Sequence, residues 1–174
     1  MRSSTRPMIG LAVVAAAMLG LAALPSTVEA ATATQNLTIN AEVLARATLT
    51  LGTAAINFSD ADPDGVPSIA ANENPVSVTA RVRTAAGSTP TLTVQANGDL
   101  TSGTDTIPIS NVTWTASGAP FIGGTMNAAV AQSAATFGTG SGSYTGSFNF
   151  FLANSWDYEV GNYTATATYT LTAP

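Results

Sequence analysis

Residues 161–171 read GNYTATATYTL, and every second position from the tyrosine onward is apolar. The apolar positions are Tyr163, Ala165, Ala167, Tyr169 and Leu171. A period of two places these side chains on one face of a β-strand, and the intervening threonines suit the solvent side of a pleated sheet. We therefore expect a half-buried C-terminal strand here.

The same alternation runs through residues 35–51, QNLTINAEVLARATLTL. The apolar odd positions are Leu37, Ile39, Ala41, Val43, Ala45, Ala47, Leu49 and Leu51. At about 3.4 Å per residue this stretch would span roughly 55 Å, well beyond the usual strand. We expect this stretch to be divided between two subunits. Its second half would be a strand of its own domain, and residues 31–43 would be a strand donated to a neighbouring subunit.

Shorter alternating segments lie between these two ends, at 76–82, 92–96, 112–114 and 144–150, and no segment has the period of a helix. Turn sequences such as Asn97-Gly98-Asp99 separate them. We predict one all-β domain over 31–174, an immunoglobulin-like β-sandwich. Besides the odd N-terminal positions, its expected core residues are Val76, Val78, Val82, Leu92, Val94, Trp114, Phe148, Phe150, Tyr163 and Tyr169.

One edge strand of this sandwich is expected to be missing from the chain itself. The Gly-x-Tyr opening at 161–163, with Asp157 upstream, is similar to the corner before strand F of immunoglobulin-like domains. No residues then remain for a strand G. An uncovered apolar edge invites pairing with another chain.

The composition excludes many functions. The chain has no Cys and no His, and its five basic residues are all arginine. A Ser-His-Asp triad, a cysteine nucleophile, a disulfide framework and the usual zinc and haem sites are therefore absent. We expect no enzymatic activity. Residues 31–174 carry three arginines against nine carboxylates, so we also expect no nucleic-acid partner.

The first 30 residues have the features of a secretory signal peptide. Arg2 and Arg6 precede an apolar run over 8–24, Pro25 follows it, and Val28-Glu29-Ala30 offers a cleavage site after Ala30. We expect an exported protein that passes through a periplasm to the cell surface or the medium. After signal cleavage no membrane segment is expected.

The two ends together resemble chaperone–usher pilins and the cysteine-poor, spore-coat-protein-U-like secreted sandwiches. The likeness rests on the alternating C-terminal strand and on the long N-terminal strand followed by Ala55-Ile56-Asn57-Phe58. It implies a fimbrial or coat subunit that self-assembles by donated strands, with a periplasmic chaperone and an usher as partners. The sequence departs from typical pilins in lacking their Cys pair and in extending through Ala173-Pro174.

A second resemblance is to the WxL cell-wall-binding domain. Residues 163–174 follow the spacing of its last strand, with Tyr169 where that family has Trp. This likeness implies the alternative function, a monomeric wall- or glycan-binding module, in which Trp114 or Trp156 would contact the ligand. Carboxylates beside Trp156 are compatible with sugar binding, but we expect Trp156 and Tyr158 to pack at the end of the sandwich.

One loop contains candidate metal ligands. Asp60, Asp62 and Asp64 alternate before Gly65, so a tight turn could direct three hard oxygen ligands toward one Ca²⁺. The position of the bidentate Glu of an EF-hand is occupied by Ala71. The competing interpretation is a solvated Asp-Pro-Asp-Gly turn. Calcium is the one cofactor that the sequence suggests.

Overall fold

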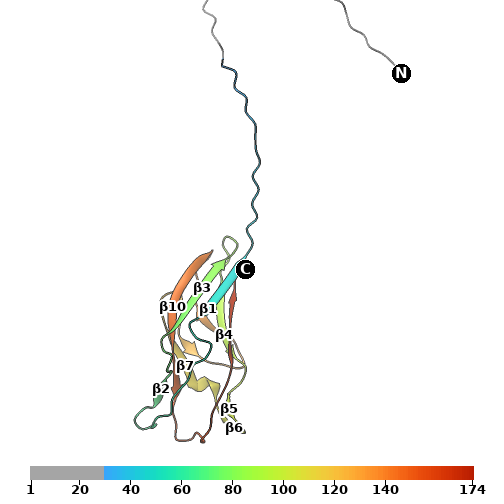
Figure 1. The fold of residues 1–174 in the computed structure, drawn as a ribbon. Coiled ribbons are helices and arrows are strands. Elements are labelled where there is room, and N and C mark those ends of the chain that lie inside the picture. The colour runs from blue at the N-terminus through green and yellow to red at the C-terminus, as the bar shows by residue number, and fades with distance from the viewer. Residues whose placement is uncertain (1–29) are drawn as a thin grey trace, which may run out of the picture. The chain divides into compact units, whose positions relative to one another are not determined.

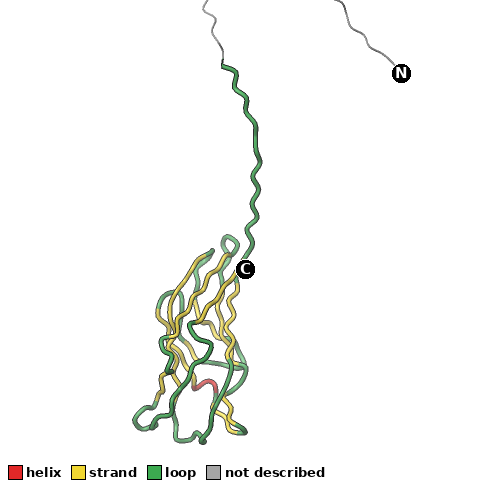
Figure 2. Tube along the Cα trace, viewed as in Figure 1, coloured by secondary structure: helices red, strands yellow, loops and turns green. Residues whose placement is uncertain are grey.

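The computed structural model describes residues 30–174. Within this range the chain consists of antiparallel β-strands and one short 3₁₀ turn, η1 (Ile109–Asn111), with no α-helix (Figures 1 and 2). The strands belong to one compact unit, Ala41–Pro174, and residues 30–40 form a separate segment. The predicted signal peptide lies, except for Ala30, outside the described residues. The all-β prediction is confirmed for the described part of the chain.

The larger sheet has β10 as its central strand. In spatial order its strands are β1 (Arg46–Leu51), β3 (Val76–Arg83), β10 (Gly142–Ala153), β7 (Val112–Ser117) and β8 (Gly124–Thr125). The short β2 (Ser68–Ala70) pairs with the last residues of β10. β10 is long enough to pair with β3 along its first half and with β7 along its second.

The smaller sheet contains the C-terminal strand. Its spatial order is β11 (Ala167–Thr172), β4 (Thr91–Ala96) and β9 (Gln132–Ala135). A separate hairpin is formed by β5 (Leu100–Ser102) and β6 (Asp105–Ile107). The inner faces of the two sheets meet, because Phe148 of β10 stacks on Tyr169 of β11 with ring centroids 5.9 Å apart. The arrangement is sandwich-like.

The core follows the alternation of the inner strands. Along β3 and β4 every second residue is buried and the residues between face solvent or are half-buried. Eight of the predicted core residues are confirmed as buried: Val76, Val78, Val82, Leu92, Val94, Trp114, Phe148 and Phe150. Tyr163 and Tyr169 are only half-buried. The packed aromatic and β-branched side chains supply most of the apolar area removed from water.

The N-terminal strand is shorter than the alternation over residues 35–51 predicted. Pairing begins at Arg46, which stands opposite Arg83, the last residue of β3. The described part of the chain offers residues 30–45 no strand to pair with, and they have no regular structure. The prediction that the odd positions before residue 46 enter the core of their own chain is wrong, since Leu37 and Ile39 are each 84% exposed.

The C-terminal strand is shorter for the same reason. Its first pair joins Ala167 to Ala96, the last residue of β4. Upstream of this pair, Thr164 makes a single bridge to Thr101 of β5. Residues 163–166 therefore connect elements and are not a continuous part of the predicted strand.

Candidate functional site

One side of the compact unit has two strand edges that no strand of the described chain covers. β1 pairs only with β3, and β11 pairs only with β4, so each is an edge strand of its sheet. The two edges are neighbours (Figure 1). Their inward side chains are only half-buried: Leu49, Leu51, Tyr169 and Leu171. The apolar core is therefore incompletely covered along this side, which we call the open edge.

Tyr169 at the open edge has a polar group with no partner. Its ring is stacked on Phe148, and its hydroxyl is buried without a hydrogen bond. Burial raises the pKa of Tyr169 well above the ordinary value of 10.0, because the phenolate would lose hydration. A buried hydroxyl without a partner destabilises the fold, so a hydrogen-bonding group added beside Tyr169 would be stabilising.

We expect Tyr169→Phe to stabilise the isolated domain by about 1 kcal/mol, because it removes an unsatisfied buried hydroxyl. It should also remove a pH dependence. The folded-state pKa lies above the unfolded-state value, so the tyrosine's contribution is complete below pH 10 and is lost as the pH rises further. At pH 11 that loss is about 1.4 kcal/mol. Urea unfolding of both proteins at pH 8 and pH 11 measures this, and parallel pH dependences would contradict it.

The other residues of the predicted C-terminal strand lie at the surface. Ala165 and Ala167 are exposed, and the half-buried Tyr163 donates its hydroxyl to the carbonyl of Glu159 at 2.9 Å. Burial, followed by the charges of Asp105 and Glu159, raises the pKa of Tyr163. These two carboxylates are therefore near the tyrosine hydroxyl, at the end of the unit where β5 and β6 lie.

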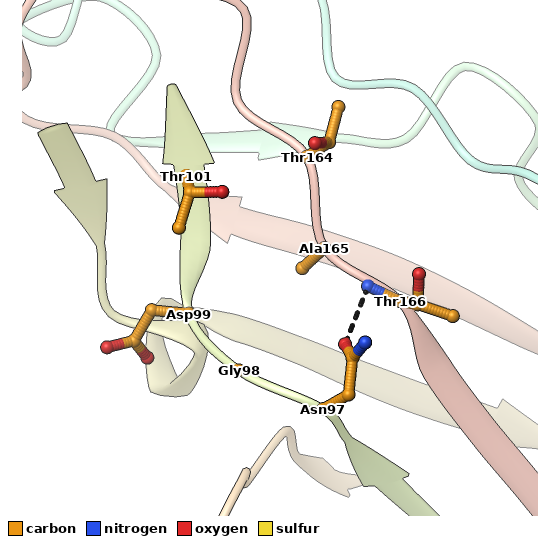
Figure 3. A pocket seen from close by; sticks show the side chains of 7 residues that line it. All are labelled: Asn97, Gly98, Asp99, Thr101, Thr164, Ala165 and Thr166. Atoms are coloured by element: carbon orange, nitrogen blue, oxygen red, sulfur yellow. Dashed lines mark hydrogen bonds between the residues drawn. The ribbon is translucent and has the colours of Figure 1, made fainter. Parts of the chain in front are cut away.

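A shallow pocket of about 350 Å³ lies beside residues 164–166 (Figure 3). Several of its polar groups form hydrogen bonds within the chain. The N–H of Thr166 donates to Oδ1 of Asn97 at 3.1 Å, and the N–H of Asn97 donates to the carbonyl of Thr166 at 2.9 Å. Asp99 also lines the pocket, and its Oδ1 accepts from the N–H of Ile109 at 2.8 Å. The hydrogen bonds between Asn97 and Thr166, which we call the joint, lie directly before the first pair of β4 and β11.

The aspartates of the predicted calcium loop form a turn. The N–H of Asp64 donates to Oδ1 of Asp62 at 3.0 Å, and the N–H groups of Gly65 and Val66 donate to the carbonyl of Asp62. Among residues 30–174 no group of three or more carboxylates is placed to hold a metal ion. Asp60, Asp62 and Asp64 are therefore not brought together as ligands.

The turn is attached to the loop that follows β10. Nδ2 of Asn154 donates to the carbonyls of Ala61 and Val66, at 2.9 and 3.0 Å. The indole N–H of Trp156 donates to Oδ1 of Asp64 at 3.2 Å. These bonds join segments that are far apart in the sequence and hold the two loops beside each other.

The structure separates the two tryptophans. Trp114 is 2% exposed and donates its indole N–H to the carbonyl of Ile122, so it is a core residue and not a ligand face. Trp156 is 70% exposed, and the prediction that it packs at the end of the sandwich is wrong, because its loop is held outside the core. Tyr158 does pack there, with its hydroxyl bonded to the carbonyl of Ala153.

The four residues of the predicted donor strand also face solvent. Leu37, Ile39 and Val43 are among the most exposed large apolar side chains, and Ala41 is exposed as well. Single exposed apolar residues are common, but an alternating series of them on an unpaired extended segment is not.

No helix among residues 30–174 has the length and apolar character needed to cross a membrane. No family model, curated protein or solved structure matches the chain.

Proposed function

We propose that this protein is a secreted structural subunit of a bacterial surface filament, pilus or coat. Each subunit would be completed by residues 31–43 of its neighbour, added as a strand at the open edge. The observation that carries the proposal is the coexistence, in one chain, of an uncovered apolar edge and an unpaired alternating segment with its apolar side chains in solvent.

The order of the strands supports an immunoglobulin-like interpretation. In the larger sheet β1, β3, β10 and β7 correspond to strands A, B, E and D, and in the smaller sheet β11 and β4 correspond to F and C. Strand G would lie beside β11, where residues 30–174 supply no strand. A donated strand at this position would pair with the free backbone groups of β11 and cover Tyr169 and Leu171.

The energetics favour occupation of the edge. Burying Leu37, Ile39 and Val43 would contribute very roughly 5–9 kcal/mol before ordering costs, and backbone hydrogen bonds would add to it. An open apolar edge also promotes aggregation before assembly. We therefore propose that a periplasmic chaperone and an usher handle the exported subunit until the neighbour's strand replaces them.

Deleting residues 31–43 from the mature protein tests the proposal. We expect a folded domain that no longer assembles, since residues 46–51 still form β1 with β3. A synthetic 31–43 peptide should bind the truncated domain and raise its melting temperature. Sedimentation velocity measures assembly, and circular dichroism measures folding.

A substitution pair separates strand donation from a general effect of the segment. Leu37→Ser with Ile39→Ser should abolish peptide binding and assembly, because both apolar side chains enter the core of the acceptor. Thr38→Ser with Asn40→Ser, on the opposite face of the same strand, should leave both nearly unchanged. Normal assembly of the truncated protein would overturn the proposal.

The exposed indole of Trp156 favours the second candidate function, a monomeric wall- or glycan-binding module. An aromatic face beside carboxylates can stack on a sugar and accept from its hydroxyls. Saturable binding of the monomeric protein to peptidoglycan or polysaccharide, lost in Trp156→Ala with the fold intact, would favour this function over the filament subunit.

A further inference from the structure

The two ends of the compact unit carry opposite charge. β1 begins and β3 ends at one end, where Pro174 also lies, and β2, β5 and β6 lie at the other (Figure 1). The first, which we call the basic end, carries all three described arginines: Arg46, Arg81 and Arg83. The second, the acidic end, carries seven of the nine described carboxylate side chains: Asp60, Asp62, Asp64, Asp99, Asp105, Asp157 and Glu159.

The arginines of the basic end are neighbours on an exposed sheet surface. Arg46 stands directly opposite Arg83, and Arg81 is paired with Thr48, two residues along. All three are exposed. Like charges directly opposite each other in a sheet are destabilising. The cluster therefore weakens the isolated subunit slightly, and a carboxylate partner from outside would relieve the repulsion.

The acidic end has an exposed aromatic face. Trp156 donates its indole N–H to Oδ1 of Asp64 at 3.2 Å, and most of the side chain stays exposed. Asp157 is the next residue, and Oγ of Ser155 donates to its Oδ2 at 3.0 Å. A flat aromatic face bordered by carboxylates suits a guanidinium group, which stacks on the ring and donates to the oxygens.

We propose that the acidic end, with Trp156 and Asp64 at its centre, binds the basic end of a second copy of this chain. The contact is head-to-tail, so each added copy leaves a free end of each kind and the assembly is a filament. This end-to-end contact rests on the proposed function, because it would join successive subunits that exchange strands. The observations behind it are separate: the complementary charges of the two ends and the exposed indole.

The contact also sets the direction of the donated strand. The 31–43 segment precedes Arg46 and so leaves its subunit at the basic end. Against the acidic end of the next copy, residue 43 would enter the open edge there. β11 runs from the acidic end, where Ala167 follows the joint at Asn97, to the basic end, where Pro174 accepts from Ala85. The donated strand would therefore run antiparallel to β11.

Charge exchange tests the contact. Arg81→Glu/Arg83→Glu and Asp64→Arg/Asp157→Arg should each slow assembly by about tenfold or more, because each creates like charges across the contact. An equimolar mixture should associate again, as the altered basic end of one variant meets the altered acidic end of the other. The rate of wild-type assembly should fall roughly several-fold when the salt concentration is raised from 50 to 500 mM, because salt screens the charges across the contact.

Trp156 gives a second readout with its own control. Trp156→Ala should slow assembly, and Val160→Ala, which truncates another exposed apolar side chain of the same loop, should not. Indole emission should shift to shorter wavelength on assembly. Slow assembly of the mixed charge variants, or equal effects of the two alanine variants, would overturn the proposed contact.

The two proposals fail separately. If only the end contact is wrong, the charge variants assemble normally. If only strand donation is wrong, truncation of 31–43 leaves a salt-dependent association that the charge variants still slow by about tenfold or more. Binding of the 31–43 peptide to the charge variants measures the open edge alone, and circular dichroism confirms that every variant is folded.

Discussion

Phe148→Ala is expected to lower the free energy of unfolding by about 3–5 kcal/mol. The Phe148 side chain has no exposed surface and contacts rings from both sheets, with centroid distances of 5.7 Å to Phe121, 6.2 Å to Phe150 and 5.9 Å to Tyr169. Its removal would leave a cavity at the centre of the domain. Domains of this kind have about 5–15 kcal/mol of stability in all, so the variant should be marginally folded.

The same strand supplies the control for this substitution. Phe151 lies on the opposite face of β10 and is only half-buried. Phe151→Ala should therefore cost less than half as much. Urea unfolding followed by circular dichroism measures both variants, and equal losses would contradict the assignment of Phe148 to the centre of the core.

Asn74→Ala is expected to lower the free energy of unfolding by about 1–3 kcal/mol. The Asn74 side chain replaces a missing strand beside β10. Its Nδ2 donates to the carbonyl of Phe150, and its Oδ1 accepts from the N–H of the same residue, both at 2.8 Å. Truncation would leave the N–H of Phe150 without a partner inside the protein, whereas its carbonyl would still accept from the N–H of Ala71 at 3.0 Å.

Two further variants define the cause. Asn74→Asp retains the acceptor but not the donor at neutral pH, so it should still destabilise. Asn72→Ala removes an exposed amide that donates to Oγ of Ser59 at 3.0 Å, and should cost under about 1 kcal/mol. If Asn72→Ala destabilised the protein as much as Asn74→Ala, the pairing with Phe150 would not be the reason.

The inner strands could be predicted from the sequence because each has a buried and an exposed face. In β3 the alternate residues Val76, Val78, Ala80 and Val82 are buried and the residues between them are not, so a period of two identifies the strand and its core side together. The same pattern could not locate the start of β1. Residues 37–43 and 47–51 alternate alike, but only the second group has a strand beside it, and backbone pairing depends on that neighbour.

The arrangement around Trp156 could not be predicted locally. Trp156 and Asp64 are distant in sequence, and their contact depends on β10 bringing one loop beside the other. One signal was present in the sequence. Residues 154–157, Asn-Ser-Trp-Asp, surround the tryptophan with polar residues where the alternation stops, a setting less typical of a core tryptophan than that of Trp114.

The late position of β10 in the chain has a consequence for how the protein folds. β10 pairs with β2, β3 and β7, so the larger sheet lacks its middle until residues 142–153 are available. The smaller sheet can be completed only later, because β4 pairs with β9 and with the C-terminal strand β11. Such long sequence separations give a high contact order and folding times of milliseconds to seconds. A chain that emerges N-terminus first would remain without its two sheets until most of its length is available.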